Sequence, residues 1–178
     1  MKPVLGDGAN RGKGAAVAAG ARAAQGDLVL QVDVDMSVPL EDLALVAEAM
    51  RGGADMVVGT REFKGPKLRI APRHRLLLGQ TFNWVVRRMT GLEFRDTQCG
   101  FKLIPAATAR ELLATQVCTG FAYDVELLLR AQVAGLEVAA VPVGYVHDSR
   151  SSVRVGSASL RMLYDVARMT RRIKPKRG

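Results

Sequence analysis

Apolar runs of strand length alternate with longer amphipathic stretches along the chain. The short runs predict strands at 27–32 and 54–58, an extended segment at 97–104 and a last strand at 137–146. The amphipathic stretches predict helices over 15–25, 39–51, 75–89, 105–115, 122–134 and 157–173. Pro142 interrupts the last strand and favours an edge position, because proline cannot donate a ladder hydrogen bond. The alternation predicts an α/β fold with a mostly parallel sheet and flanking helices.

Charged side chains directly follow two of the predicted strands. Asp33 and Asp35 come at the end of strand 27–32, and Arg61 follows strand 54–58. Alternate residues of a strand share a face, so the two carboxylates are expected to converge. Their repulsion calls for a positive partner, and Mg²⁺ takes one or two carboxylates together with phosphate oxygens. Ligands of such sheets bind beyond the carboxyl ends of the strands, which places Arg61 in the same site. The alternative is that Asp33, Asp35 and Arg61 are ordinary solvated surface residues.

Composition limits the partners of this site. The chain has 178 residues, the length of one domain, and 48% of them are hydrophobic, enough for a core. Its 26 Lys and Arg residues against 17 acids give a net charge of +9, which favours nucleic acid, an anionic membrane or phosphorylated small molecules. Aromatic residues make up only 5%, which argues against a base-stacking surface. No transmembrane helix or signal peptide is expected.

Two basic loops are candidates for binding phosphate. The segment Asn10 to Gly14 lacks the spacing of a P-loop or a dinucleotide-binding loop, yet its glycines let backbone approach an anion and Lys13 adds charge. Asn10 is also a candidate helix cap. The segment 61–75 has six Lys and Arg residues and the single acid Glu62. The alternative is a flexible turn for residues 10–14 and a solvated charged loop for residues 61–75.

The segments that carry this chemistry occur in an order that resembles a known family. They are Asn10–Ala15, Asp33–Asp35, Gly59–Arg61, Asp96–Lys102, Phe121–Glu126 and Val141–Val143. Together they resemble the family-2 glycosyltransferases that charge polyprenyl phosphates, of the dolichyl-phosphate β-glucosyltransferase and dolichyl-phosphate mannose synthase type. The stretch Asp-Thr-Gln-Cys-Gly-Phe-Lys at 96–102 is the most specific of these motifs.

The resemblance implies a GT-A-like, Rossmann-like fold and a metal-dependent, inverting hexosyl transfer. A hexose, glucose before others, would pass from an NDP-sugar (UDP-glucose or GDP-mannose) to a polyprenyl or dolichyl phosphate. The resemblance implies Asp33 and Asp35 as ligands of Mg²⁺ or Mn²⁺. It places Arg61 near a substrate phosphate and Glu126 near the active centre, so these four residues are the expected catalytic residues.

The resemblance also implies substrate-binding residues in both basic loops, in the segment 96–102 and near residue 150. They are Asn10, Lys13, Arg69, Arg73, Asp96, Gln98, Lys102, Ser152 and Arg154. Ser152 and Arg154 would lie close to the lipid phosphate. Met36 departs from the small residue that relatives usually have after the second aspartate, which bears on the fit of the sugar.

Relatives begin with two further strands, one of which ends in Pro-x-Tyr-Asn-Glu. Residues 1–156 are therefore expected to form a partial, N-terminally truncated GT-A domain, and residues 157–178 a basic amphipathic helix and tail. Such a helix suits an anionic bilayer, which predicts a cytoplasmic protein peripheral at the inner face of the membrane; a solvated C-terminal helix and tail is the alternative. The alternative is a truncated, non-catalytic remnant that binds anions or a membrane surface; nucleic acid is not an expected partner.

Overall fold

The computed structural model describes residues 9–61, 73–145 and 155–173, with the backbone alone for 73–80 and 155–160. Its sheet contains β1 (Leu28–Gln31), β2 (Met56–Arg61), β3 (Lys102–Pro105) and β4 (Val138–Val143), in the order β1-β3-β2-β4. β2 and β4 are parallel, whereas β3 runs antiparallel to both of its neighbours, β1 and β2. The α/β fold was predicted; the reversed strand inserted at its centre was not. β4 lies at an edge, as Pro142 predicted.

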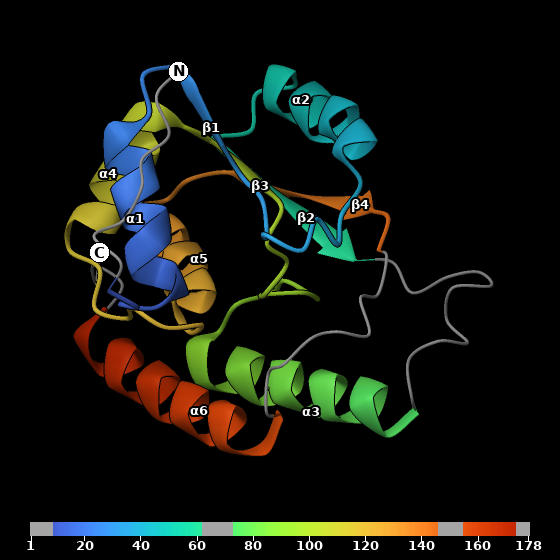
Figure 1. The fold of residues 1–178 in the computed structure, drawn as a ribbon, viewed down its shortest axis with the longest axis vertical. Helices are drawn as coiled ribbons and strands as arrows, with labels where there is room; N and C mark the ends of the chain where they lie inside the picture. Colours follow the sequence, from blue (N-terminus) through green and yellow to red (C-terminus); the bar gives the residue numbers. More distant parts are fainter. Residues whose placement is uncertain (1–8, 62–72, 146–154, 174–178) are drawn as a thin grey trace.

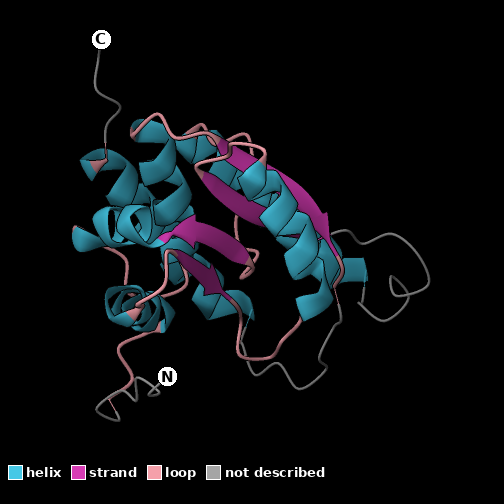
Figure 2. Ribbon diagram, turned by 90° about the horizontal axis from the view of Figure 1, so that it is seen from above, coloured by secondary structure: helices cyan, strands magenta, loops and turns pink. Residues whose placement is uncertain are grey.

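Helices cover both faces of this sheet (Figure 1). α2 (Leu43–Arg51), which follows a 3-10 turn at Leu40–Asp42, packs on one face. The other face carries α1 (Lys13–Ala23), α4 (Ala106–Ala114) and α5 (Tyr123–Val133). α3 (Arg73–Thr90) and α6 (Val155–Arg172) lie side by side beyond α5. Seen from above, the strands are enclosed between helical layers (Figure 2).

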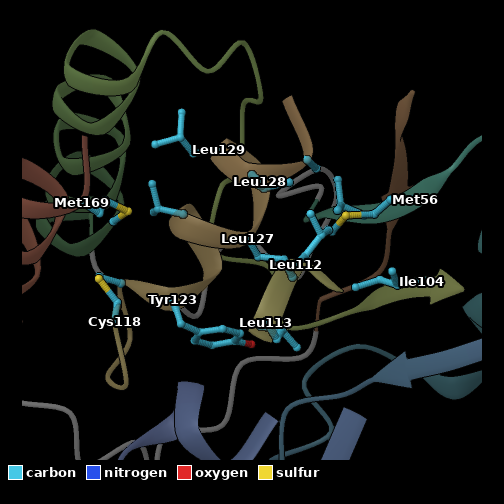
Figure 3. Packing of buried hydrophobic residues seen from close by; sticks show 14 of the residues in the cluster. Met56, Ile104, Leu112, Leu113, Cys118, Tyr123, Leu127, Leu128, Leu129 and Met169 are labelled. Carbon is cyan, nitrogen blue, oxygen red and sulfur yellow. The ribbon is translucent and has the colours of Figure 1, made fainter. Parts of the chain in front are cut away.

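Alternation along the strands builds two hydrophobic cores. Met56 and Val58 of β2 join the larger cluster with α1, α4 and α5, while Val57 between them joins the smaller cluster under α2. This is the period of two expected of a strand that is covered on both faces. The α5 leucines lie between Met56 of the sheet and Met169 of α6 (Figure 3). Because Met169 is fully buried there, α6 packs onto the domain rather than standing apart from it.

The C-terminal ends of β1 and β2 lie on the same side of the sheet, and we call this side the sheet edge of the candidate site. Gln31, the last residue of β1, and Val58 of β2 both pair with Lys102, the first residue of β3. β1 and β2 therefore run in the same direction, and the segments that follow them leave the sheet on the same side. None of the helices in the described ranges is both long enough and apolar enough to cross a bilayer.

Candidate functional site

A turn, and not a strand, presents the two aspartates. β1 ends at Gln31, and the backbone amide of Met36 donates to the carbonyl of Asp33 at 2.9 Å. The amide of Ser37 donates to Asp35 Oδ1 at 3.1 Å. Met36 has a φ of +49°, the left-handed conformation that such turns use. Asp33 and Asp35 therefore lie in a turn, to which the period of a strand does not apply, and the convergence of their carboxylates stays a prediction.

Asp33 belongs to a group of four side chains that we call the lysine–aspartate cluster: Lys13, Asp33, Lys102 and Asp124. The Lys13 Nζ atom lies 2.6 Å from Asp33 Oδ1 and 3.2 Å from Asp124 Oδ2. Lys102 Nζ pairs with the other oxygen of Asp124 and donates to the carbonyl of Cys99. The sequence analysis predicted a positively charged partner for Asp33, and Lys13 of the glycine-rich loop is such a partner.

The cluster is buried at one end and open at the other. The side chains of Lys102 and Asp124 are 1% and 2% exposed, whereas those of Lys13 and Asp33 are 23% and 27% exposed. Burial opposes the charge of Lys13, but Asp124 and Asp33 outweigh it and raise the pKa of Lys13. Two ammonium groups thus face two carboxylates, and the cluster is close to neutral as a whole.

Asp124 is the functional candidate that sequence reasoning missed, because only the segment Phe121–Glu126 was singled out and Glu126 was the acid chosen from it. Besides both lysines, the amide of Gln31 contacts it at 3.4 Å, and the same amide donates to the Tyr123 hydroxyl. Burial, reinforced by Asp124, raises the pKa of that hydroxyl. The available signal was an acid among apolar neighbours, because an acid there is expected to be buried and paired.

The absence of a side chain at Gly100 provides the space that the Asp33 carboxylate occupies. A Cβ atom at this position would lie 2.1 Å from the Asp33 carboxylate. Gly100 follows Cys99, whose carbonyl Lys102 holds. A glycine is therefore required for Asp33 to approach the backbone at the start of β3.

Arg61 and Asp96 form a second, separate ion pair at the same edge. Arg61 donates from Nε to Asp96 Oδ2 at 2.7 Å and from Nη2 to Oδ1 at 2.9 Å. Burial disfavours both charges, yet the pairing outweighs it, raising the pKa of Arg61 and lowering that of Asp96. The guanidinium also lies 5.5 Å from the ring centre of Tyr145. Asp96, predicted to bind substrate, thus holds Arg61 in place.

The segment from Asp96 to Lys102 connects these parts to the helices. Thr97 donates to Asn83 of α3 at 3.0 Å. Gln98 Nε2 approaches the Met162 sulfur of α6 at 2.9 Å, so Gln98, predicted to bind substrate, contacts α6. Lys102, also predicted to bind substrate, is a buried partner of Asp124, and its contact with substrate stays a prediction.

The glycine-rich loop packs against protein. A Cβ at Gly12 would lie 2.4 Å from the Thr119 carbonyl, and one at Gly14 would collide with the side chain of Tyr123 and the carbonyl of Cys118. The amide of Ala15 donates to the same Thr119 carbonyl at 3.2 Å. One of the free backbone amides at the N-terminus of α1 therefore already has a hydrogen-bond acceptor, which weakens the case for a phosphate site there. The side chain of Asn10 accepts from the Gly12 amide and does not cap the helix.

Glu126 is held away from the lysine–aspartate cluster by other partners. Its carboxylate, 1% exposed, accepts from the amides of Val117 and Cys118 at 2.8 and 2.6 Å. Arg130 Nε donates to it at 2.8 Å. These contacts fit a structural clamp on the segment before α5, and the catalytic role of Glu126 stays a prediction. Asp124, two residues earlier, is the acid that faces the candidate site.

Four predicted residues have side chains beyond the described part. Arg69, Ser152 and Arg154 lie outside the described residues. Arg73 begins α3, but its side chain is not described. Their predicted contacts with substrate stay predictions.

The donor set of the 33–36 turn suits a hard divalent cation. Asp33 and Asp35 offer carboxylate oxygens, and Mg²⁺ commonly takes one or two carboxylates beside phosphate oxygens and water. The Asp33 carboxylate can lie beside the backbone of Gly100 because that residue has no Cβ. Across 9–61, 73–145 and 155–173, no group of three or more His, Cys, Asp or Glu side chains is arranged to hold a metal. A cation bound by this pair would therefore need further ligands from water or substrate.

Comparison with known proteins gives matches over most of the chain. The sequence model described as Glycosyl transferase family 2 matches residues 4–113. Dolichyl-phosphate beta-glucosyltransferase of Dictyostelium discoideum is 32% identical over 166 residues, covering 90% of this chain and 51% of that protein. Polyprenol monophosphomannose synthase of Mycolicibacterium smegmatis is 27% identical over 135 residues, covering 75% of this chain and 51% of that protein. The chain spans about half the length of these relatives.

Solved structures confirm the predicted fold. Glucosyl-3-phosphoglycerate synthase from Mycobacterium tuberculosis, in complex with Mn²⁺ and UDP-glucose, superposes with a TM-score of 0.60 at 21% identity. The match covers 98% of this chain and 58% of that one. The UDP complex of the same enzyme gives a TM-score of 0.61. The α/β, GT-A-like architecture is therefore confirmed.

Proposed function

The chain belongs to glycosyltransferase family 2, and we propose that it transfers a hexose from an NDP-sugar to a polyprenyl phosphate with inversion at the anomeric carbon. An oxygen of the acceptor phosphate bonds to that carbon, the bond from the carbon to the donor diphosphate breaks, and the nucleoside diphosphate leaves with the electron pair. UDP-glucose is the preferred donor and GDP-mannose the second: the names of the two relatives give glucose and mannose as the sugars, and the solved neighbour was crystallised with UDP-glucose.

The observation that carries this proposal is the joint placement of Asp33 and Arg61. Arg61 is the last residue of β2 and Asp33 comes two residues after the end of β1, and the two strands run in the same direction. Both residues contact the segment from Asp96 to Lys102: Arg61 through the Asp96 carboxylate and Asp33 through Gly100. An acidic group and a fixed guanidinium at one sheet edge suit a reaction between two phosphate-bearing substrates.

The proposed hexosyl transfer requires no proton transfer by a strongly basic side chain. A phosphate monoester acceptor is already ionised near neutral pH, so no strong general base is needed. The work is electrostatic and positional: Lys13 lies beside Asp33, where a diphosphate would depart, and Arg61, held by Asp96, lies where a second phosphate would approach. Asp33 and Asp35 would hold Mg²⁺ or Mn²⁺, which when bound stabilises charge on the leaving diphosphate.

A membrane surface is the proposed location, on the cytoplasmic side where anionic lipids gather. Trp84 of α3 and Tyr164 of α6 are 65% and 69% exposed, and these two helices lie side by side (Figure 1). Exposed arginines accompany them at positions Arg87, Arg88, Arg161, Arg168, Arg171 and Arg172. Exposed aromatic rings and exposed basic residues on the same helices are typical of helices that lie in the lipid interface.

The test is a transfer assay on the purified chain. It is incubated with Mn²⁺, UDP-[¹⁴C]glucose and polyprenyl phosphate in detergent, with GDP-[¹⁴C]mannose in parallel, and the label is followed into the organic phase. We expect β-linked glucosyl lipid from the chain and at least about 100-fold less from Asp35→Ala. Equal transfer by Asp35→Ala would overturn the role of the aspartate pair, and no transfer from either donor would overturn the activity.

A non-catalytic, membrane-binding remnant is the second candidate. The exposed aromatic and basic surface of α3 and α6 favours it independently of any chemistry. Binding to phosphatidylserine vesicles without any Mn²⁺-dependent affinity for UDP or GDP would support this alternative.

A further inference from the structure

Asp124 is the buried acid of the lysine–aspartate cluster, 2% exposed, and in the described part of the chain its carboxylate contacts Lys13, Lys102 and Gln31. We propose that Asp124 is a positioning residue that sets the place of Asp33 in the site, acting through Lys13 and through Lys102. The inference rests on the proposed function, because that function gives the position of Asp33 its purpose.

The first route passes through Lys13. Its ammonium group lies between two carboxylates, 2.6 Å from Asp33 and 3.2 Å from Asp124. Without Asp124 the ammonium group would belong to Asp33 alone and would compete with any cation that Asp33 binds. Asp124 therefore keeps the charge of Asp33 only partly compensated, which favours cation binding.

The second route passes through Lys102. This lysine joins Asp124 to the carbonyl of Cys99 and so fixes the peptide that leads into Gly100. Gly100 is the residue whose missing Cβ makes room for the Asp33 carboxylate. The same buried acid thus supports Asp33 from two sides, once by charge and once by backbone position.

Asp124 itself is well anchored. It lies in the first turn of α5, where the positive end of the helix dipole favours an acid, and the amide of Gln31 contacts it at 3.4 Å. Its neighbours Tyr123 and Val125 are fully buried. A rigid, buried partner of this kind is what holds metal ligands in place in other proteins.

The experiment measures the affinity for Mn²⁺ in the presence of UDP by calorimetry, on the full chain at a temperature where circular dichroism reports every variant folded. We expect Asp124→Asn to weaken this affinity about 10- to 100-fold, because outer partners of metal ligands have effects of that size. Asp55→Asn is the control: it removes a carboxylate that accepts from the Glu137 amide just before β2, at the other end of the sheet. The control should bind as the unmodified chain does.

Further variants separate positioning from folding. Asp124→Asn leaves Lys102 buried without its partner, so the double variant Asp124→Asn/Lys102→Met removes that penalty and should fold with the affinity still reduced. In a Lys13→Met background, Asp124→Asn should lose part of its effect, since the first route is gone; an equal effect there would overturn that route.

Two results would reject the inference. Unchanged Mn²⁺ and UDP affinity in folded Asp124→Asn would overturn the positioning role while leaving hexosyl transfer standing. An unmodified chain that binds neither Mn²⁺ nor UDP would overturn the positioning role and the proposed function together. A chain that binds both in an Asp124-dependent way, yet transfers no sugar, would overturn the transfer and support the positioning role.

Discussion

Replacing Gly100 by alanine tests whether the position of Asp33 matters to the reaction. The new Cβ would lie 2.1 Å from the Asp33 carboxylate, against the 3.4 Å at which ordinary contact begins. The carboxylate must therefore retreat by about 1.3 Å. Because the Asp33 side chain is 27% exposed, it can swing toward solvent without disturbing the core.

The expected effect on stability is small and the effect on function is large. The retreat breaks the ion pair between Lys13 and Asp33, which at this exposure is worth about 0.2–1 kcal/mol. A displacement of about 1 Å in a reacting geometry can cost about 100-fold in rate. Gly100→Ala should thus unfold in urea within about 1 kcal/mol of the unmodified chain, yet transfer labelled glucose to lipid about 100-fold more slowly.

Gly20→Ala is the matched control. A Cβ at Gly20 would meet nothing within 4 Å, and the residue lies inside α1, so alanine should stabilise the fold by up to about 1 kcal/mol and leave transfer unchanged. Full transfer by Gly100→Ala would refute the reasoning, because Asp33 would then work from a displaced position. A loss of more than about 3 kcal/mol in stability would show instead that backbone, and not the carboxylate, had moved.

Three further outcomes follow from the same contacts. Glu126→Gln should lower the free energy of unfolding in urea by about 3 kcal/mol, because a buried carboxylate that binds Arg130 and two backbone amides is lost; an unchanged midpoint would contradict the clamp. Since Arg61 outweighs burial and lowers the pKa of Asp96, the ionised carboxylate stabilises the fold above its unfolded pKa of about 3.9. The stability difference between the chain and Asp96→Asn, measured by urea unfolding, should therefore be largest at pH 7 and shrink as the pH falls below about 4 toward the lower folded value. Trp84 is the single tryptophan, so its fluorescence should shift to the blue with phosphatidylserine vesicles and return in high salt; no shift would argue against the surface of α3 and α6.

Hydrophobic periodicity predicted the positions of the helices and strands well. The predicted helix at 122–134 is α5 (Tyr123–Val133), and the predicted strand at 27–32 is β1 (Leu28–Gln31). Periodicity reports which side of an element is buried, and so it locates elements. It cannot report strand direction: β3 is antiparallel because it pairs with β1 and β2, which lie far from it in sequence.

The site was predicted in its chemistry more than in its contacts. Asp33 and Arg61 were expected at one end of the sheet, and β1, which precedes Asp33, and β2, which ends at Arg61, run in the same direction. The partners of the charges escaped prediction, because Lys13 and Asp124 are 111 residues apart and no local pattern links them. The glycines of the 10–14 loop show a related limit: glycine predicts a close approach, but the sequence does not say that the carbonyl of Thr119 is one of the groups that approach.

The charge balance at the sheet edge leads to a last prediction about the order of binding. Lys13 and Lys102 are compensated by two aspartates, and Arg61 is compensated by Asp96, so these cations offer an anion little net attraction. A divalent cation at the aspartate pair would change the sign of the local charge. UDP should therefore bind at least about tenfold more weakly in EDTA than in saturating Mn²⁺ when titrated by calorimetry. Equal affinity in both would mean that the basic residues of the 61–75 segment attract the nucleotide without help.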